Sequence, residues 1–248
     1  MAYAAILFDL FDTLVNFDRD RLPVLEIDGR TVRSTAGHVH RVLCEQAPHV
    51  TVEACYAALM ASWQEAERLR AIDHREVTAP QRFAHFLGTL DLPLAGMPAG
   101  FVDRLLETHR RQLAKAAHFP PHHAPLLAKL AARYRLAVVS NFDYTPTALE
   151  ILDSAGVMDL FTTIVVSDAV GWRKPRREIF DEALRRVGVA AAEALFVGDR
   201  ADIDVAGAHG VGMDVAWINP AREPLPPGVA APHYEIRDLG ELAGILRC

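Results

Sequence analysis

The chain has 248 residues, of which 51% are hydrophobic and 23% are charged, and its formal net charge is −6. A chain of this length and composition can bury a sizeable core, which argues against intrinsic disorder. Because Lys and Arg are spread along the chain and form no cluster, nucleic acid is not an expected partner. We therefore expect a small-molecule substrate.

No stretch approaches the ~18 apolar residues that a membrane span needs, so no membrane partner is expected. The N-terminus lacks a basic leader with a cleavage site, which predicts a cytoplasmic protein. The three cysteines, Cys44, Cys55 and Cys248, show no CxxC spacing and predict neither disulfides nor a zinc site built from them. The oligomeric state stays open between a monomer and a homodimer.

The first predicted element is a buried strand over Ala4 to Phe8, and the next predicted core strand follows more than a hundred residues later. Between them, "LPVLEIDGRTVR" predicts a hairpin with a tight turn at Asp28 and Gly29. Such a gap cannot be one loop in a compact domain, so we predict that residues 17–117 form a hairpin flap and a helical cap domain. The core domain would comprise residues 1–16 and 118–248. Within the insert, helical periodicity is found at 36–47, 52–71, 79–89 and 99–117.

The remaining chain alternates apolar strand patterns with helical patterns, which predicts a doubly wound α/β fold with a parallel sheet. Gly156, Gly188 and Gly210 follow the helical patterns and are expected to cap them. The predicted strands are 136–140, 163–167, 194–197 and 215–218, with a last short strand at 234–236, and the predicted helices are 147–155, 177–187 and 202–209.

Polar residues follow each of the first four core strands, at the end where parallel sheets bind ligands. The first strand is followed by Asp9, Asp12 and Thr13, the second ends at Ser140 and Asn141, the third leads to Lys174, and the fourth leads to Asp199, Asp202 and Asp204. Any one of these residues could be a helix cap or a turn residue.

Two of these carboxylates, Asp9 and Asp199, would need a compensating cation if the fold brings them together. At a separation of ~4 Å they repel by about 4 kcal/mol at an effective dielectric constant of 20. The polar residues at these strand ends offer oxygen ligands and include no His or Cys, which favours Mg²⁺.

In this order, the motifs resemble those of the haloacid dehalogenase-like (HAD) hydrolase superfamily. "DLFDT" is similar to motif one, "VVSN" to motif two, the Lys of "WRKP" to motif three and "VGDRADIDVAGAHGVGM" to motif four. The insert falls between motifs one and two, where the family keeps its small helical cap. The resemblance implies a Rossmann-like core with strand order 5-4-1-2-3 and a phosphatase-like member of the superfamily.

The resemblance also implies roles for the strand-end residues in hydrolysis of a small phosphorylated metabolite. Asp9 would be the nucleophile that forms an aspartyl-phosphate. The substrate-binding residues would be Ser140, Thr13 and Asn141, which would bind the phosphoryl group. Lys174 would also contact the substrate and would offset the negative charge that Asp9 and the phosphate share. The Mg²⁺ ligands would be Asp9, Asp199, Asp204 and the backbone carbonyl of Phe11, although Asp204 could instead orient Lys174.

Phe11 departs from the family pattern, because phosphatases of the superfamily usually carry an Asp there that protonates the leaving alcohol. Its absence lowers acid catalysis by about 10²- to 10⁴-fold unless another group substitutes. Asp12 is the candidate for this catalytic role, and its alternative is to pin the turn. Phe11 also leaves two other functions open, a metal-independent 2-haloacid dehalogenase and a low-turnover regulatory protein that binds a phosphate ligand. Asp199 and Asp204 favour the magnesium-dependent phosphatase, because an acidic cluster has little use without a cation.

Overall fold

The computed structural model describes residues 3–92 and 94–247. The chain divides into two compact units, and we describe each by itself. The core unit holds the residues up to 17 and those from 118 onward, and the cap unit holds residues 18–117. Two short strands, β2 (Asn16–Phe17) and β5 (Ala117–His118), pair where the chain passes from one unit to the other.

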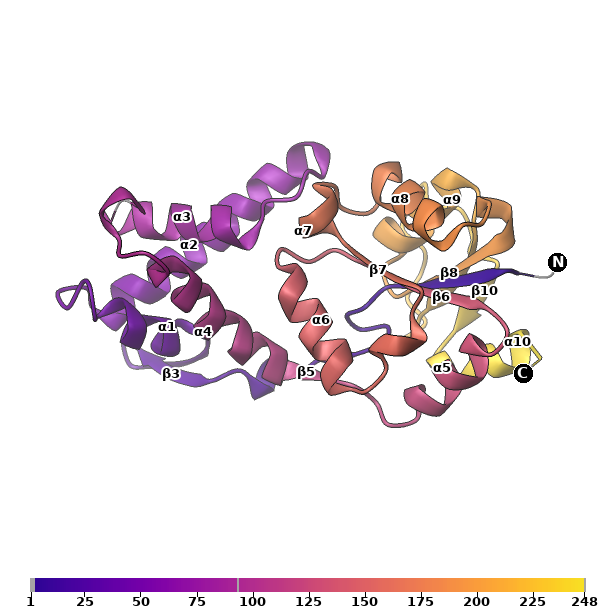
Figure 1. Ribbon diagram of the computed structural model, residues 1–248, viewed down its shortest axis with the longest axis horizontal. Helices are drawn as coiled ribbons and strands as arrows, with labels where there is room; N and C mark the ends of the chain where they lie inside the picture. The colour runs from indigo at the N-terminus through magenta and orange to yellow at the C-terminus, as the bar shows by residue number, and fades with distance from the viewer. Residues whose placement is uncertain (1–2, 93, 248) are drawn as a thin grey trace. The chain divides into compact units, whose positions relative to one another are not determined.

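The core unit is built on a six-stranded parallel sheet (Figure 1). The predicted order is confirmed for the first five core strands along the chain, and the short last strand extends the sheet at one edge. In spatial order the strands are β10 (Tyr234–Ile236), β9 (Asp214–Ile218), β8 (Ala194–Gly198), β1 (Ala5–Phe8), β6 (Arg135–Ser140) and β7 (Thr163–Val166).

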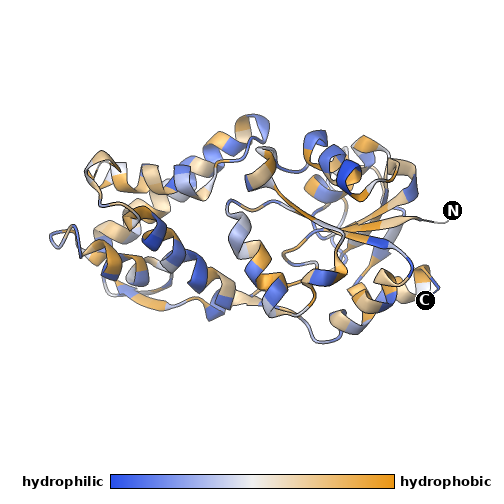
Figure 2. Cartoon of the chain, in the orientation of Figure 1, coloured by the Kyte–Doolittle hydropathy of each residue, from blue (hydrophilic) through white to orange (hydrophobic). Residues whose placement is uncertain are grey.

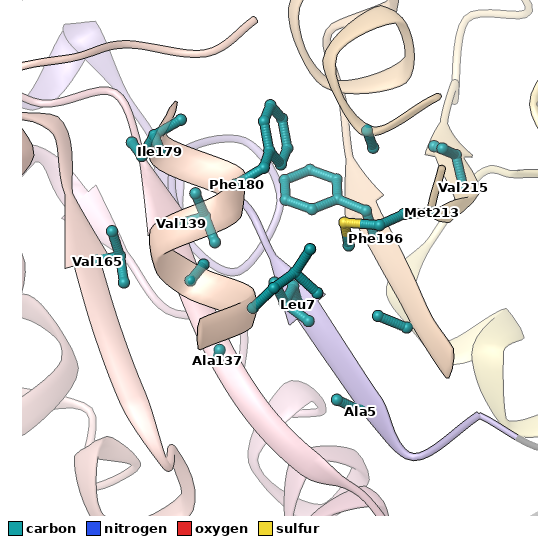
Figure 3. Close-up of a cluster of buried hydrophobic side chains, with 14 of the residues drawn as sticks. Ala5, Leu7, Ala137, Val139, Val165, Ile179, Phe180, Phe196, Met213 and Val215 are labelled. Carbon is teal, nitrogen blue, oxygen red and sulfur yellow. The ribbon is translucent and has the colours of Figure 1, made fainter. Parts of the chain in front are cut away.

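The sheet is buried on both faces, which explains why its strands are apolar runs and do not alternate with polar residues. All four residues of β1 are fully buried, and Figure 2 shows the central strands as hydrophobic. On one face, Leu7 and Phe196 pack with Phe180 of α8 (Arg177–Val187), as Figure 3 shows. The rings of Phe180 and Phe196 meet edge to face at 5.2 Å.

Helix α8 has its predicted bounds and ends at Gly188, whose φ of 75° is the left-handed conformation expected of a glycine cap. The predicted cap at Gly210 is wrong. A π-helical turn at Ala201–Val205 leads into α9 (Ala206–Val211), and Gly212, with φ 88°, ends that helix instead. The other core helices are α5 (His123–Ala131), α6 (Thr145–Ser154), α7 (Ser167–Val170) and α10 (Leu242–Ile245), and 3₁₀ turns lie at Met158–Leu160, Ala191–Glu193 and Leu239–Glu241.

The cap unit begins with the predicted hairpin, whose turn residues Asp28 and Gly29 have positive φ values of 49° and 73°. Four helices follow it, and Thr78 forms a capping box with Gln81 at the start of the third. The elements of this unit are β3 (Val24–Ile27), β4 (Arg30–Arg33), α1 (Ala36–Leu43), α2 (Val52–Asp73), α3 (Ala79–Thr89) and α4 (Phe101–Ala116), with 3₁₀ turns at Arg19–Arg21 and Leu94–Gly96. Within residues 3–92 and 94–247, no helix has both the length and the apolar composition that a membrane crossing requires.

Candidate active site

Asp9 lies at the carboxyl end of β1, between the ends of the neighbouring strands. Its backbone amide donates to the carbonyl of Val197 on β8, at 2.9 Å, which continues the parallel ladder one residue beyond β1. The Nζ atom of Lys174 donates to Oδ1 of Asp9 at 2.6 Å and lies 2.8 Å from Oδ1 of Asp204. Lys174 and Asp204 are 2% and 1% exposed, so their ion pair has little contact with solvent. Its electrostatic interactions are therefore stronger than they would be in water.

The side chain of Asp204 is fixed by the strand and the turn that precede it. The amide of Arg200 donates to Oδ2 of Asp204 at 3.0 Å. A Cβ atom at Gly198 would lie 2.4 Å from the same oxygen, so the last residue of β8 must be glycine for the carboxylate to occupy this place. Motif four therefore needs its glycine for close packing against its own acid.

Asp199 directly follows β8 and completes the acidic group. The indole nitrogen of Trp217 on β9 donates to the backbone carbonyl of Asp199 at 2.8 Å, which holds this residue at the sheet edge. One carboxylate oxygen each from Asp9, Asp199 and Asp204 lies within 4.8 Å of the others. The fold thus brings together the three acids that were predicted as metal ligands.

The acidic group is short of positive charge. When all three carboxylates are ionised, the single ammonium of Lys174 leaves two negative charges unbalanced. Burial raises the pKa of Asp9 to about 6, against the attraction of Lys174. Burial, and then the charges of Asp9 and Asp204, raises the pKa of Asp199 to about 8. A divalent cation with a preference for oxygen ligands fits this set, because it would supply the missing charge.

Two buried hydroxyl groups, one in the loop that follows Asp9 and one at the end of the strand that pairs with β1, lack a hydrogen-bond partner within the described chain. They are Oγ of Ser140, at the end of β6, and Oγ1 of Thr13, in the loop after β1, and their residues are 0% and 3% exposed. A buried polar group without a partner costs about 1–3 kcal/mol, so these hydroxyls call for an oxygen-rich ligand or water.

Asn141 was predicted to bind substrate, and the structure engages both ends of its side-chain amide with Lys174. Nδ2 of Asn141 donates to the carbonyl of Lys174 at 2.9 Å, and Oδ1 accepts from the Lys174 amide at 2.7 Å. This reciprocal pair joins the loop after β6 to the loop that carries the lysine. Asn141 is therefore a positioning residue for Lys174.

The loop after Asp9 holds Phe11 and Asp12 in different environments. Asp12 has a φ of 57°, and its Oδ1 accepts from the Phe17 amide at 3.0 Å, which is the turn-pinning arrangement. The ring of Phe11 lies 5.0 Å from that of Phe142 and 5.9 Å from that of Phe17. An apolar aromatic cluster thus replaces the acid that the family usually carries at this position.

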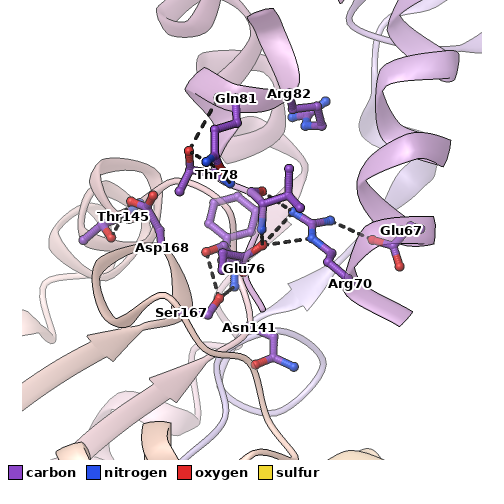
Figure 4. Close-up of polar contacts among 12 residues, drawn as sticks. Glu67, Arg70, Glu76, Thr78, Gln81, Arg82, Asn141, Thr145, Ser167 and Asp168 are labelled. Carbon is purple, nitrogen blue, oxygen red and sulfur yellow. Dashed lines mark hydrogen bonds and ion pairs between the residues drawn. The ribbon is translucent and has the colours of Figure 1, made fainter. Parts of the chain in front are cut away.

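A second set of hydrogen bonds, which the sequence did not predict, connects the segment after β6 with the segment after β7. Oδ2 of Asp168 accepts from the amide and the hydroxyl of Thr145 at 2.9 and 2.8 Å, and Figure 4 shows these two residues facing each other. Oγ of Ser167 accepts from the Phe142 amide at 2.9 Å. The predicted third strand is one residue too long because Ser167 begins α7. A Ser-Asp pair after a strand is a common helix start, so the sequence carries no specific signal for these hydrogen bonds.

Comparison with known proteins finds relatives of this chain. The family described as haloacid dehalogenase-like hydrolase matches residues 48–218. A glyceraldehyde 3-phosphate phosphatase of Pyrococcus abyssi is 29% identical over 213 residues, which cover 86% of this chain and 80% of that protein. YfnB of Bacillus subtilis, assigned to the HAD hydrolases, is 32% identical over 143 residues, and these cover 57% of this chain but only 60% of YfnB.

Two solved structures extend the likeness to the whole chain. A crystal structure of YfnB bound to magnesium has a TM-score of 0.64 at 25% identity and is covered completely, as is this chain. A 2-haloacid dehalogenase from Pseudomonas syringae has a TM-score of 0.73 at 26% identity, with 100% of this chain and 99% of that chain covered. Together with the family match, these likenesses show that the chain belongs to the haloacid dehalogenase-like hydrolases and is an enzyme.

Proposed function

We propose that this hydrolase is a magnesium-dependent phosphatase that cleaves small phosphate monoesters through an aspartyl-phosphate at Asp9. One observation carries the proposal, namely that three clustered carboxylates, two of them buried, face one lysine ammonium and are therefore short of positive charge. An anionic substrate alone would worsen this imbalance, whereas a divalent cation would cancel it and so let an anionic phosphate approach. The similarity to an archaeal glyceraldehyde 3-phosphate phosphatase supports the same reaction class.

In the first step, a carboxylate oxygen of Asp9 forms a bond to phosphorus while the ester bond to the leaving oxygen breaks. Lys174 holds Oδ1 of Asp9 and offsets the negative charge where nucleophile and phosphate meet. The hydroxyls of Ser140 and Thr13 donate to the phosphoryl oxygens, which gives both groups the partner that they lack. The leaving alkoxide takes its proton from water, since Phe11 carries none.

In the second step, the hydroxide left by that protonation attacks the phosphorus of the aspartyl-phosphate. The bond between phosphorus and Asp9 breaks, inorganic phosphate leaves and the carboxylate is restored. Asp9, Asp199 and Asp204, with the carbonyl of Phe11, would hold Mg²⁺. The ion would neutralise the carboxylates and withdraw charge from the phosphoryl oxygens.

The second candidate function is hydrolysis of 2-haloacids, which two observations favour. The structure is similar to that of a 2-haloacid dehalogenase, and Phe11 removes an acid that displacement of a halide does not need. In that reaction Asp9 would displace the halide from carbon, and water would hydrolyse the resulting ester. The surplus of carboxylates argues against this candidate, because halide displacement uses no cation.

A panel of phosphate monoesters and 2-haloacids, assayed with Mg²⁺ and with a chelator, separates the candidates. The proposal expects phosphate release that requires Mg²⁺ and is absent in Asp9→Asn. Chelator-insensitive halide release would establish the dehalogenase instead. Phosphate binding without turnover on any ester would favour the regulatory protein. Action in the cytoplasm, as a monomer or a homodimer, stays a prediction.

A further inference from the structure

A second group of possible metal ligands lies in the core unit, built from a different set of residues than the active site. His122 and His123 begin α5, and Asp238 precedes the 3₁₀ turn near the end of the chain. We call these three residues the histidine cluster. Each offers one ligand atom, and these atoms lie within 4.8 Å of one another.

One pair of ligand atoms in the histidine cluster has a spacing close to that of a tetrahedral metal site. Nε2 of His122 lies 3.1 Å from Oδ2 of Asp238. Two ligands at the usual zinc distances, about 2.0–2.1 Å, are separated by roughly 3.3 Å across a tetrahedral angle. The rings of His122 and His123 meet edge to face with their centroids 4.5 Å apart.

Hydrogen bonds to backbone groups already orient two of the three side chains. Nδ1 of His123 lies 2.9 Å from the carbonyl oxygen of Leu14, which can only accept, so Nδ1 carries the proton and Nε2 keeps the lone pair. Oδ1 of Asp238 accepts from the Gly240 amide at 2.8 Å, which leaves Oδ2 for another partner. Such supporting bonds to a carbonyl or an amide are a regular feature of metal-ligating His and carboxylate groups.

We propose that the histidine cluster binds one divalent transition-metal ion of the zinc type. Two imidazole nitrogens and one carboxylate oxygen suit Zn²⁺, whereas Mg²⁺ prefers the all-oxygen set of the active site. His122 and Asp238 have side chains that are 57% and 53% exposed, so water can complete the coordination. The ion would tie the start of α5 to the segment that precedes α10, and through His123 to the loop that contains Thr13.

The test measures Zn²⁺ binding to the full chain in excess Mg²⁺, which occupies the acidic site. Competition with a chromophoric chelator gives the affinity, and Co²⁺ as a zinc substitute reports nitrogen ligands through its visible absorption. We expect one tightly bound ion per chain in the wild type and in Asp199→Asn. His122→Ala should weaken binding by about 10-fold or more. Asp238→Asn, which keeps an acceptor for the Gly240 amide, should also weaken it.

The matched control is His233→Ala. His233 pairs with Asp214 at 3.0 Å, but its Nδ1 accepts from the Val215 amide, and the pair is not part of a three-ligand group within the described residues. This variant should bind Zn²⁺ like the wild type. Three results would each overturn the proposal: no Zn²⁺ binding in excess Mg²⁺, equal binding by His122→Ala and His233→Ala, or loss of the ion in Asp199→Asn. Equal thermal unfolding midpoints in metal-free buffer exclude misfolding as the cause.

Discussion

The core unit and the cap unit each contain a buried ionic cluster, and the two clusters differ in how completely they are satisfied. In the cap unit, all three guanidinium nitrogens of Arg70 donate, to Glu76 at 2.9 Å, to Glu67 at 2.7 Å and to the carbonyl of Val77 at 2.8 Å (Figure 4). Glu76 also accepts from the Val77 amide at 3.0 Å. This cluster ties the end of α2 to the segment that leads into α3.

In the core unit, one lysine faces three carboxylates, two of these have raised pKa values, and two neighbouring hydroxyls have no partner among the described residues. Both clusters contain buried charges, Lys174 and Asp204 in the core unit and Arg70 and Glu76 in the cap unit, so the presence of buried charge does not separate a structural site from a functional one. The two clusters differ in how many of their polar groups have a partner. A closed network, whose groups are all paired, stabilises the fold, whereas an open network, with unpaired groups, can bind a ligand.

The largest effect should come from Asp9→Asn, which removes the nucleophile from the open cluster. Turnover of p-nitrophenyl phosphate should fall by roughly 10⁴-fold or more, because no other group in the cluster takes over the attack. The thermal midpoint without metal should stay the same or rise, since a neutral amide relieves the repulsion. A large drop in stability with residual turnover would mean that this cluster is structural, like that of Arg70.

Phe11→Asp should have the next largest effect, because it restores an acid two residues after the nucleophile. For alkyl phosphates, whose leaving groups need a proton, kcat/KM should rise by about 10²- to 10⁴-fold. For p-nitrophenyl phosphate, whose leaving group departs as an anion, the gain should be small. The comparison of kcat/KM across leaving groups is the measurement, and Phe11→Asn is the matched control without an acid. A gain that is equal for all esters, or shared by Phe11→Asn, would contradict an acid role.

Arg70→Ala tests the closed cluster. It removes a cation that pairs with the carboxylate of Glu76, which is 0% exposed, and should lower the free energy of unfolding by about 3–5 kcal/mol. Arg68→Ala is the matched control on the same helix, because Arg68 pairs with Glu65 at the surface with 63% of its side chain exposed. The control should lose at most about 1 kcal/mol. Denaturant unfolding measures both variants, and equal losses would refute the distinction.

The smallest of the expected effects is the change in thermal stability that Mg²⁺ and pH cause through the open cluster. The folded-state pKa of Asp199 is raised from 3.8 to about 8, so the metal-free folded state holds a proton that the unfolded state releases. Its contribution to stability is therefore complete below about pH 4 and is lost as pH rises through 8. Saturating Mg²⁺ should raise the thermal midpoint by roughly 5–10 °C, and more at pH 8 than at pH 5. Asp199→Asn should reduce this pH dependence, and calorimetry with and without Mg²⁺ checks it.

The fold was largely predictable because the central strands of the core, such as β1 and β8, are buried on both faces and form apolar runs. The order of strands came from the family resemblance and is confirmed, and the hairpin turn at Asp28 and Gly29 was predictable from its residue types. Helix α5 was not predicted, because the prolines and histidines of "FPPHHAP" hide its start. The turn before α9 was also missed, because the contacts of Asp204 with Arg200 and Gly198 shape it.

The candidate site was predictable only as a list of residues at strand ends. Contacts between residues that are distant along the chain could not be predicted from the sequence. One example is the hydrogen bonding of Asn141 to the backbone of Lys174, 33 residues away. The structure also shows Asp12 bound to the Phe17 amide, a choice that depends on one backbone angle. The cluster around Arg70 left no sequence signal, since arginine and glutamate pairs are common on exposed helices as well.

The position of β1 has a consequence for biosynthesis. This strand leaves the ribosome well before its two neighbours in the sheet, β6 and β8, and its residues pair with partners from Arg135 and Ala194 onward. Residues 18–117, which lie between β1 and β6, form a compact unit that we expect to fold while the apolar "AILF" segment of β1 is still exposed. Strand pairing over such long sequence separations slows folding and leaves an aggregation-prone apolar segment exposed. We therefore expect nascent chains that stop before residue 198 to need chaperones, and Asp9 to meet its cationic partner Lys174, 165 residues further along, only after that lysine has emerged.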